Sequence, residues 1–114
     1  MPLFILKFLL AIMLFPATLL PTGISEEVTG TVVWEKPDCD HYIIETDRYY
    51  VLAERYTGRL YNGDNVQGEL YGTGFKLLKN LSGQDSEVKV YLENYWTSKQ
   101  ACLDWLKENR KCGL

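Results

Sequence analysis

The sequence has a single histidine, no glycine-rich phosphate-binding loop and no run of like charges. One histidine, His41, offers little material for acid–base catalysis, and the 15 carboxylates form no recognisable catalytic pair. The segments GTG and GELYG lack the helix entry and the lysine of a P-loop. The net charge of −3 gives no excess of positive charge, from which nucleic-acid affinity largely derives. These absences predict a protein that is not an enzyme, needs no cofactor and does not bind nucleic acid.

Residues 1–25 are typical of a signal peptide. Lys7 precedes a largely apolar run from Phe8 to Leu20, and small residues suited to signal peptidase close the segment. Cleavage there leaves 26–114 as one small domain that is exported, either to a periplasm or out of the cell. The alternative is an uncleaved membrane anchor over 3–20, because that stretch is just long enough to span a bilayer.

Only three cysteines are present, Cys39, Cys102 and Cys112. A small exported domain often relies on a disulfide, and an odd count leaves one free thiol or an intermolecular bridge. The segment KQACLDWLKE predicts a helix with Cys102, Trp105 and Leu106 on one face, which makes Cys102 a buried core thiol. Cys39 lies in a predicted loop and Cys112 beyond the helix end, so these two are the better-placed pair. Spacing alone leaves the connectivity open.

Stretches rich in β-branched and aromatic residues predict strands at 28–35, 41–46, 49–54, about 65–71 and 87–96. Asp47-Arg48 offers a tight turn between the second and third of these. The segment FKLLKN either continues the fourth strand or makes a short turn. TSKQ resembles a capping box with Thr97 as N-cap, which opens a helix to about Asn109.

Glycines in and beside the fourth strand indicate bends of the kind that curl a short sheet into a barrel. The predicted fold is therefore mainly β. We expect a small five-stranded antiparallel barrel of the OB or SH3-like kind with a C-terminal α-helix, following the N-terminal signal peptide.

The run YIIETDRYYVLAE, followed by YNGDNVQGELYGTGFKLLKN and VKVYLENYWTSKQACLDWL, resembles a family of small exported bacterial proteins with no known function. The resemblance covers about Thr31 to Leu106. It rests on an IIET–YVLAE hairpin, a GD.V.G strand entrance and a V.V..YW.S ending. One departure is GTGF at 72–75, in place of a compact Tyr-Gly-Phe step, and this departure implies a shifted bulge. The resemblance implies an OB-like barrel and brings no catalytic residues.

The segment DCDH at 38–41 contains four potential metal ligands in a row. Zinc needs three or four ligands that converge, whereas neighbouring side chains of an extended chain point apart. The plainer interpretation is a loop in which Cys39 is half of a disulfide. The alternative is a small metal- or redox-linked exported protein that uses Cys39 and His41.

The many aromatic side chains favour a binding surface. Alternation in VKVYLENYW places Val88, Val90 and Leu92 on one face, so we expect Tyr91 and Tyr95 to point outward. Arginines around the hairpin are suited to carboxylates. The predicted function is a non-catalytic binding module for a protein or a cell-envelope component, with membrane contact only if the N-terminal segment stays uncleaved. The candidate binding residues are Tyr49, Tyr91, Tyr95, Arg48, Arg55 and Arg59.

Overall fold

The computed structural model describes residues 27–82 and 86–114. The elements are β1 (Val28–Trp34), β2 (His41–Glu45), β3 (Tyr50–Thr57), β4 (Asn65–Gly68), β5 (Gly74–Asn80), β6 (Glu87–Trp96) and α2 (Lys99–Glu108). The predicted signal peptide, or anchor, lies outside the described residues. In the part of the chain that the structure describes, no helix is both long and apolar enough to cross a membrane.

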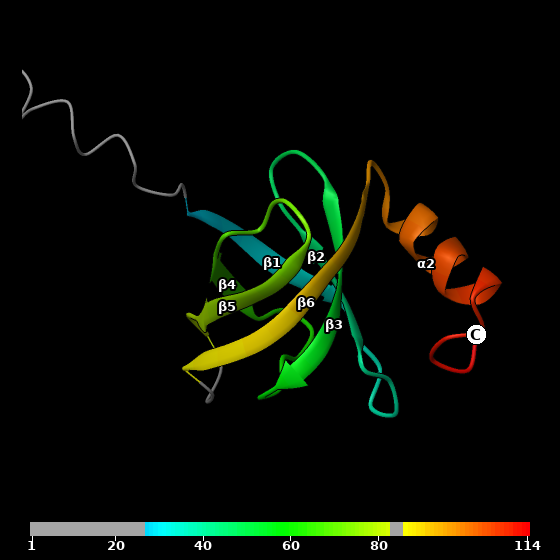
Figure 1. Cartoon of the computed structure of the whole chain (residues 1–114), viewed down its shortest axis with the longest axis horizontal. Helices are drawn as coiled ribbons and strands as arrows, with labels where there is room; N and C mark the ends of the chain where they lie inside the picture. The colour runs from blue at the N-terminus through cyan, green and yellow to red at the C-terminus, as the bar shows by residue number, and fades with distance from the viewer. Residues whose placement is uncertain (1–26, 83–85) are drawn as a thin grey trace, which may run out of the picture.

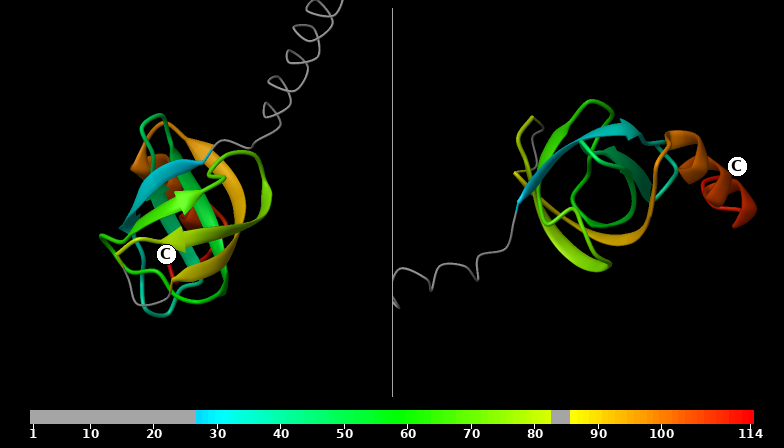
Figure 2. Two further views of the ribbon diagram at one scale, coloured as in Figure 1. Left: turned by 90° about the vertical axis from the view of Figure 1, so that its left-hand side faces the viewer. Right: turned by 90° about the horizontal axis from the view of Figure 1, so that it is seen from above.

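The strands form a closed antiparallel barrel in the order β1-β2-β3-β6-β5-β4, and pairing of β1 with β4 closes the ring. Figure 1 and the right-hand view of Figure 2 show the ring of strands with α2 lying outside it. The barrel has six strands, so the prediction of five is corrected: FKLLKN belongs to a strand of its own, β5. Gly72 and Gly74 have φ of 70° and 108°, and this left-handed backbone turns the chain back between β4 and β5.

The predicted hairpin between β2 and β3 is confirmed. Glu45 pairs with Tyr50, and the N–H of Thr46 donates to the carbonyl of Tyr49 at 2.9 Å, which leaves Asp47-Arg48 at the tip. The hydroxyl of Thr46 accepts the Tyr49 N–H at 3.2 Å. A side-chain hydroxyl thus supports the turn, as Ser and Thr often do in such loops.

Both faces of the β2–β3 hairpin are buried, each against a different cluster. Tyr42, Ile44 and Val51 point into the barrel, where the main core lies. Ile43 and Leu52 point outward and pack under α2. Because successive side chains of a strand point to opposite faces, both halves of the alternation must be apolar where a helix covers the outside of a barrel.

Ser98 is the N-cap of α2, so the prediction of Thr97 is off by one residue. The Ser98 Oγ accepts the N–H of Ala101 at 3.1 Å, which satisfies a donor that the first helical turn leaves open. The predicted apolar face is confirmed: Cys102 and Leu106 are fully buried, and the half-buried Trp105 packs against the same cluster.

A β-bulge in β6 changes which side chains face outward. Ala53 pairs with Leu92 and Leu52 pairs with Asn94, so Glu93 is an extra residue without a partner on β3. One extra residue reverses the alternation beyond it. Tyr95 therefore packs against the barrel core, while Trp96 packs under α2. The prediction that Tyr95 points outward together with Tyr91 is wrong for this reason.

Candidate functional site

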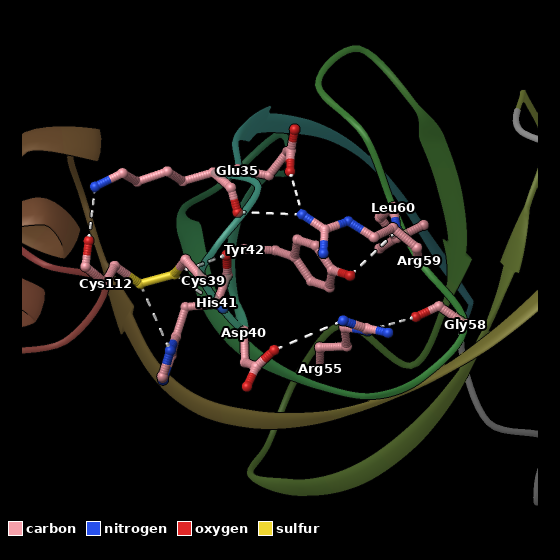
Figure 3. Close-up of polar contacts among 11 residues, drawn as sticks. Glu35, Cys39, Asp40, His41, Tyr42, Arg55, Gly58, Arg59, Leu60 and Cys112 are labelled. Carbon is pink, nitrogen blue, oxygen red and sulfur yellow. Dashed lines mark hydrogen bonds and ion pairs between the residues drawn. A yellow bond between two sulfur atoms is a disulfide. The ribbon is translucent and has the colours of Figure 1, made fainter.

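The predicted disulfide between Cys39 and Cys112 is present and joins the loop before β2 to the segment after α2 (Figure 3). The Lys36 ammonium donates to the Cys112 carbonyl at 2.9 Å and adds a second link between the same segments. Cys102 is the free cysteine, and burial raises the pKa of its thiol to about 11. The thiol of Cys102 is therefore protonated near neutral pH and unsuited to nucleophilic chemistry.

His41 is 4% exposed and lies between the disulfide and a carboxylate. Its Nδ1 faces Cys112 Sγ (Figure 3) at a distance of 3.9 Å, and its Nε2 is 2.8 Å from Glu93 Oε1. The bulge in β6 places Glu93 here. The ring centroids of His41 and Trp105 are 6.4 Å apart, so α2 covers one side of the histidine.

Two groups of potential metal ligands share this histidine. Cys39 and Cys112 form one group with His41, and Glu54 and Glu93 form the other; within each group the ligand atoms lie within 4.8 Å of one another. The first group is closed to a metal while its two sulfurs are joined in the disulfide. The second uses carboxylate oxygens and one imidazole nitrogen, a set that suits Zn²⁺. Glu54 and Glu93 were not singled out in the sequence, because their approach to His41 depends on strand pairing.

Two of the three predicted arginines form ion pairs within the fold. Arg59 donates to Glu35 at 2.9 Å and to the Lys36 carbonyl at 3.1 Å (Figure 3), and the hydrogen bond to Glu35 raises the pKa of its guanidinium. Arg55 lies 3.7 Å from Asp40 and donates to the Gly58 carbonyl at 3.0 Å. These contacts hold the loops at one end of the barrel.

Arg48, by contrast, is exposed at the tip of the β2–β3 hairpin. The structure therefore does not bring the three arginines together into one carboxylate-binding surface.

Tyr49 and Tyr95 lie together beside the barrel core, away from Tyr91. Their rings meet edge to face with centroids 4.9 Å apart, and both pack against the main core. The Tyr49 hydroxyl donates a hydrogen bond to the Leu70 carbonyl at 2.7 Å, and the Tyr95 hydroxyl donates one to the Gly72 carbonyl. Burial raises the pKa of Tyr95 to about 12. Both tyrosines thus contribute to packing in this fold.

Tyr91 belongs to a different group, on the outside of the barrel. Edge-to-face contacts join Tyr56 to Phe75 at 4.6 Å and Phe75 to Tyr91 at 5.0 Å between centroids. Tyr56 is 54%, Phe75 50% and Leu77 61% exposed. The ammonium of Lys89 lies 5.0 Å from the centre of the Phe75 ring. We call Tyr56, Phe75, Leu77 and Tyr91 the aromatic surface.

The sequence pointed only to Tyr91 of this group. Phe75 and Leu77 alternate with Lys76 and Leu78, a pattern that marks a strand face once β5 is recognised as a strand. Their exposure becomes apparent only from the pairing of β5 with β6, in which Phe75 lies opposite Tyr91.

An open pocket of about 520 Å³ lies along β1, beside the start of β4. Its lining is mainly polar, with hydroxyl and carboxylate side chains. The lining residues are Thr29, Gly30, Thr31, Glu45, Thr46, Asp47, Asn65, Leu81 and Ser82.

Comparison of the chain with protein-family models, with curated proteins and with solved structures found no match. The resemblance to a family of small bacterial proteins accordingly stays a prediction, and the function is argued from the residues described above.

Proposed function

We propose that this protein is an exported, non-catalytic binding module that contacts a protein or a cell-envelope component through its aromatic surface. The observation that carries the proposal is the row of edge-to-face rings formed by Tyr56, Phe75 and Tyr91, with Leu77 beside it. Large aromatic side chains are enriched in binding interfaces, where they bury much area at little entropic cost.

Two features make this surface suited to recognition. The rings lie on three paired strands, β3, β6 and β5, so their positions are fixed before a partner arrives. The Lys89 ammonium over Phe75 adds a polar group at the edge, and a polar rim around apolar anchors is typical of specific interfaces. The proposal includes an OB-like barrel, a fold that binds ligands on the face of its curved sheet.

The proposed setting is outside the cytoplasm. A disulfide is typical of oxidising compartments, and the Cys39–Cys112 bridge is in keeping with export of this domain. The proposal includes a cleaved signal peptide, with membrane anchoring by residues 3–20 as its alternative. The alternative function is a small metal- or redox-linked exported protein that uses Cys39 and His41, and the disulfide of Cys39 with Cys112 beside His41 favours its redox form.

Site-specific photocrosslinking in the producing cells tests the binding proposal. A photoreactive phenylalanine analogue at position 75 is expected to give a discrete adduct in the exported fraction. The adduct should disappear when Tyr56→Ser and Tyr91→Ser are introduced into the same chain. The analogue at Tyr61, which is 57% exposed outside the aromatic surface, is the matched control and should give no such adduct. Equal adducts from positions 75 and 61, or an adduct that survives both substitutions, would refute the proposal.

A further inference from the structure

We infer that His41, Glu54 and Glu93 form a binding site for a divalent transition metal, with Zn²⁺ as the expected ion. The three side chains come from β2, β3 and the bulge of β6, and their ligand atoms lie within 4.8 Å of one another. Glu54 pairs with Tyr91, so the site adjoins the aromatic surface, but it uses other side chains and its test does not depend on the role of that surface.

Strand pairing brings the histidine and one carboxylate together. His41 pairs directly with Glu54, so their side chains lie on the same, outer face of the sheet. The bulge adds Glu93, whose Oε1 is 2.8 Å from His41 Nε2. Bulges often redirect a side chain towards a functional site. All three ligands are thus held by the sheet, and rigid strands position ligands better than loops do.

A buried histidine at this place faces two half-buried carboxylates. His41 is 4% exposed, and apart from their mutual contact neither its Nε2 nor Glu93 Oε1 has a hydrogen-bond partner among the described residues. The ion pairs of the described part of the chain join neither Glu54 nor Glu93 to a lysine or arginine. Two carboxylates beside one imidazole repel each other, and a divalent cation would remove that repulsion.

The distances suit a small tetrahedral ion. Ligand bonds of about 2.0–2.2 Å to Zn²⁺ at tetrahedral angles separate neighbouring ligand atoms by about 3.4 Å. The Nε2–Oε1 distance of 2.8 Å and the upper limit of 4.8 Å lie on either side of this value. Binding of the ion therefore requires the Nε2–Oε1 distance to lengthen by about 0.6 Å. Three protein ligands leave one position open to water or to a group on a partner.

The chemistry of the ligands selects among ions. An imidazole nitrogen favours Zn²⁺ over Mg²⁺ and Ca²⁺, which prefer oxygen ligands alone. When Nε2 binds the ion, Nδ1 carries the ring proton and faces Cys112 Sγ at 3.9 Å. The disulfide stays intact in this arrangement, so the site needs no reductant and suits an oxidising compartment.

Titration of the full-length chain with Co²⁺, a coloured substitute for Zn²⁺, tests the site. We expect saturation at one ion per chain, visible d–d bands, no thiolate-to-cobalt charge-transfer band, and displacement by Zn²⁺. Zn²⁺ should also raise the melting temperature, because it binds only the folded chain at this site. A chain that shows no saturable binding would refute the inference. A thiolate band that appears only after reduction would move the site to Cys39 and Cys112 and likewise refute it.

Two variants of equal charge change make the test specific. Glu54→Gln removes one ligand and leaves the His41–Glu93 contact in place, so the fold should be retained. The affinity for Co²⁺ should fall at least about tenfold, because loss of a residue that only supports a ligand already lowers metal affinity by about that factor. Glu87→Gln removes an exposed carboxylate near the start of β6 and should bind Co²⁺ as the unmodified chain does. Equal affinity of Glu54→Gln and Glu87→Gln, with unchanged circular dichroism, would show that Glu54 is no ligand.

Discussion

The hydroxyl of Tyr42 accepts a hydrogen bond from the backbone N–H of Leu60 at 3.2 Å, and both residues are almost completely buried. Leu60 belongs to the connection between β3 and β4, whereas Tyr42 points into the barrel from β2. The contact therefore secures a loop to the core. Desolvation by burial raises the pKa of Tyr42, so the hydroxyl is neutral over the ordinary pH range.

Replacement of Tyr42 by phenylalanine should lower the free energy of unfolding by about 1–3 kcal/mol. The ring still fills its place, but the buried N–H of Leu60 loses its acceptor. Urea unfolding measures the loss. Tyr56→Phe, at an exposed ring, is the control and should change stability by less than about 0.5 kcal/mol. Equal effects of the two substitutions would show that the Tyr42 hydrogen bond contributes nothing to stability.

Loss of the disulfide should destabilise the domain considerably. The bridge joins residues 73 positions apart, and closing a loop of that length stabilises a fold by about 4 kcal/mol in the chain-entropy model. Cys39→Ser with Cys112→Ser should therefore lower the urea midpoint strongly. Reductant provides the control, because it should lower the midpoint of the unmodified protein and leave the double variant unchanged. If reductant also lowered the urea midpoint of the double variant, the fall seen in the unmodified protein could not be assigned to the Cys39–Cys112 disulfide.

The buried thiol of Cys102 should make stability fall in alkaline solution. Burial raises the pKa of this thiol from 9.0 to about 11, so the folded state holds its proton more tightly than the unfolded state. The resulting stabilisation is complete below pH 9 and is lost as the pH rises through 11, a loss on the order of 2–3 kcal/mol.

Urea unfolding at intervals from pH 8 to 11 measures this loss. Cys102→Ala removes the titrating group, so its stability should be lower at pH 8 because of the cavity but should fall less steeply above pH 9. Parallel curves for the two proteins would contradict the assignment to Cys102. Iodoacetamide at pH 8 should modify Cys102 only after unfolding.

Local sequence patterns predicted several parts of this molecule. The β2–β3 hairpin, the apolar face of α2 and the preference for Cys39 and Cys112 as the disulfide pair follow from local features, such as a turn dipeptide, a helical spacing or a place in a loop. The barrel was predicted from a series of short strands and from the glycines near the fourth, although one strand was missed.

Features that depend on a partner strand were missed. The alternation of FKLLKN leaves β5 open because each of its faces mixes apolar and polar residues, and only pairing with β6 fixes which face is outside. The bulge at Glu93 is missed when VKVYLENYW is read as a regular strand, although two successive polar residues, Glu93 and Asn94, interrupt its alternation. That one residue both removes Tyr95 from the outer face and brings Glu93 to His41.

The bulge also predicts unequal effects of two tyrosine substitutions four residues apart. Tyr95→Ser should cost about 1–3 kcal/mol, below the value for a fully buried aromatic, because Tyr95 packs against the core and Tyr49. Tyr91→Ser removes a ring from the outer aromatic surface and should cost clearly less. Thermal and urea unfolding of the two variants measure the difference. If β6 lacked the bulge, Tyr91 and Tyr95 would share one face and the two substitutions would cost the same, so equal losses would overturn the register of β3 and β6 described here.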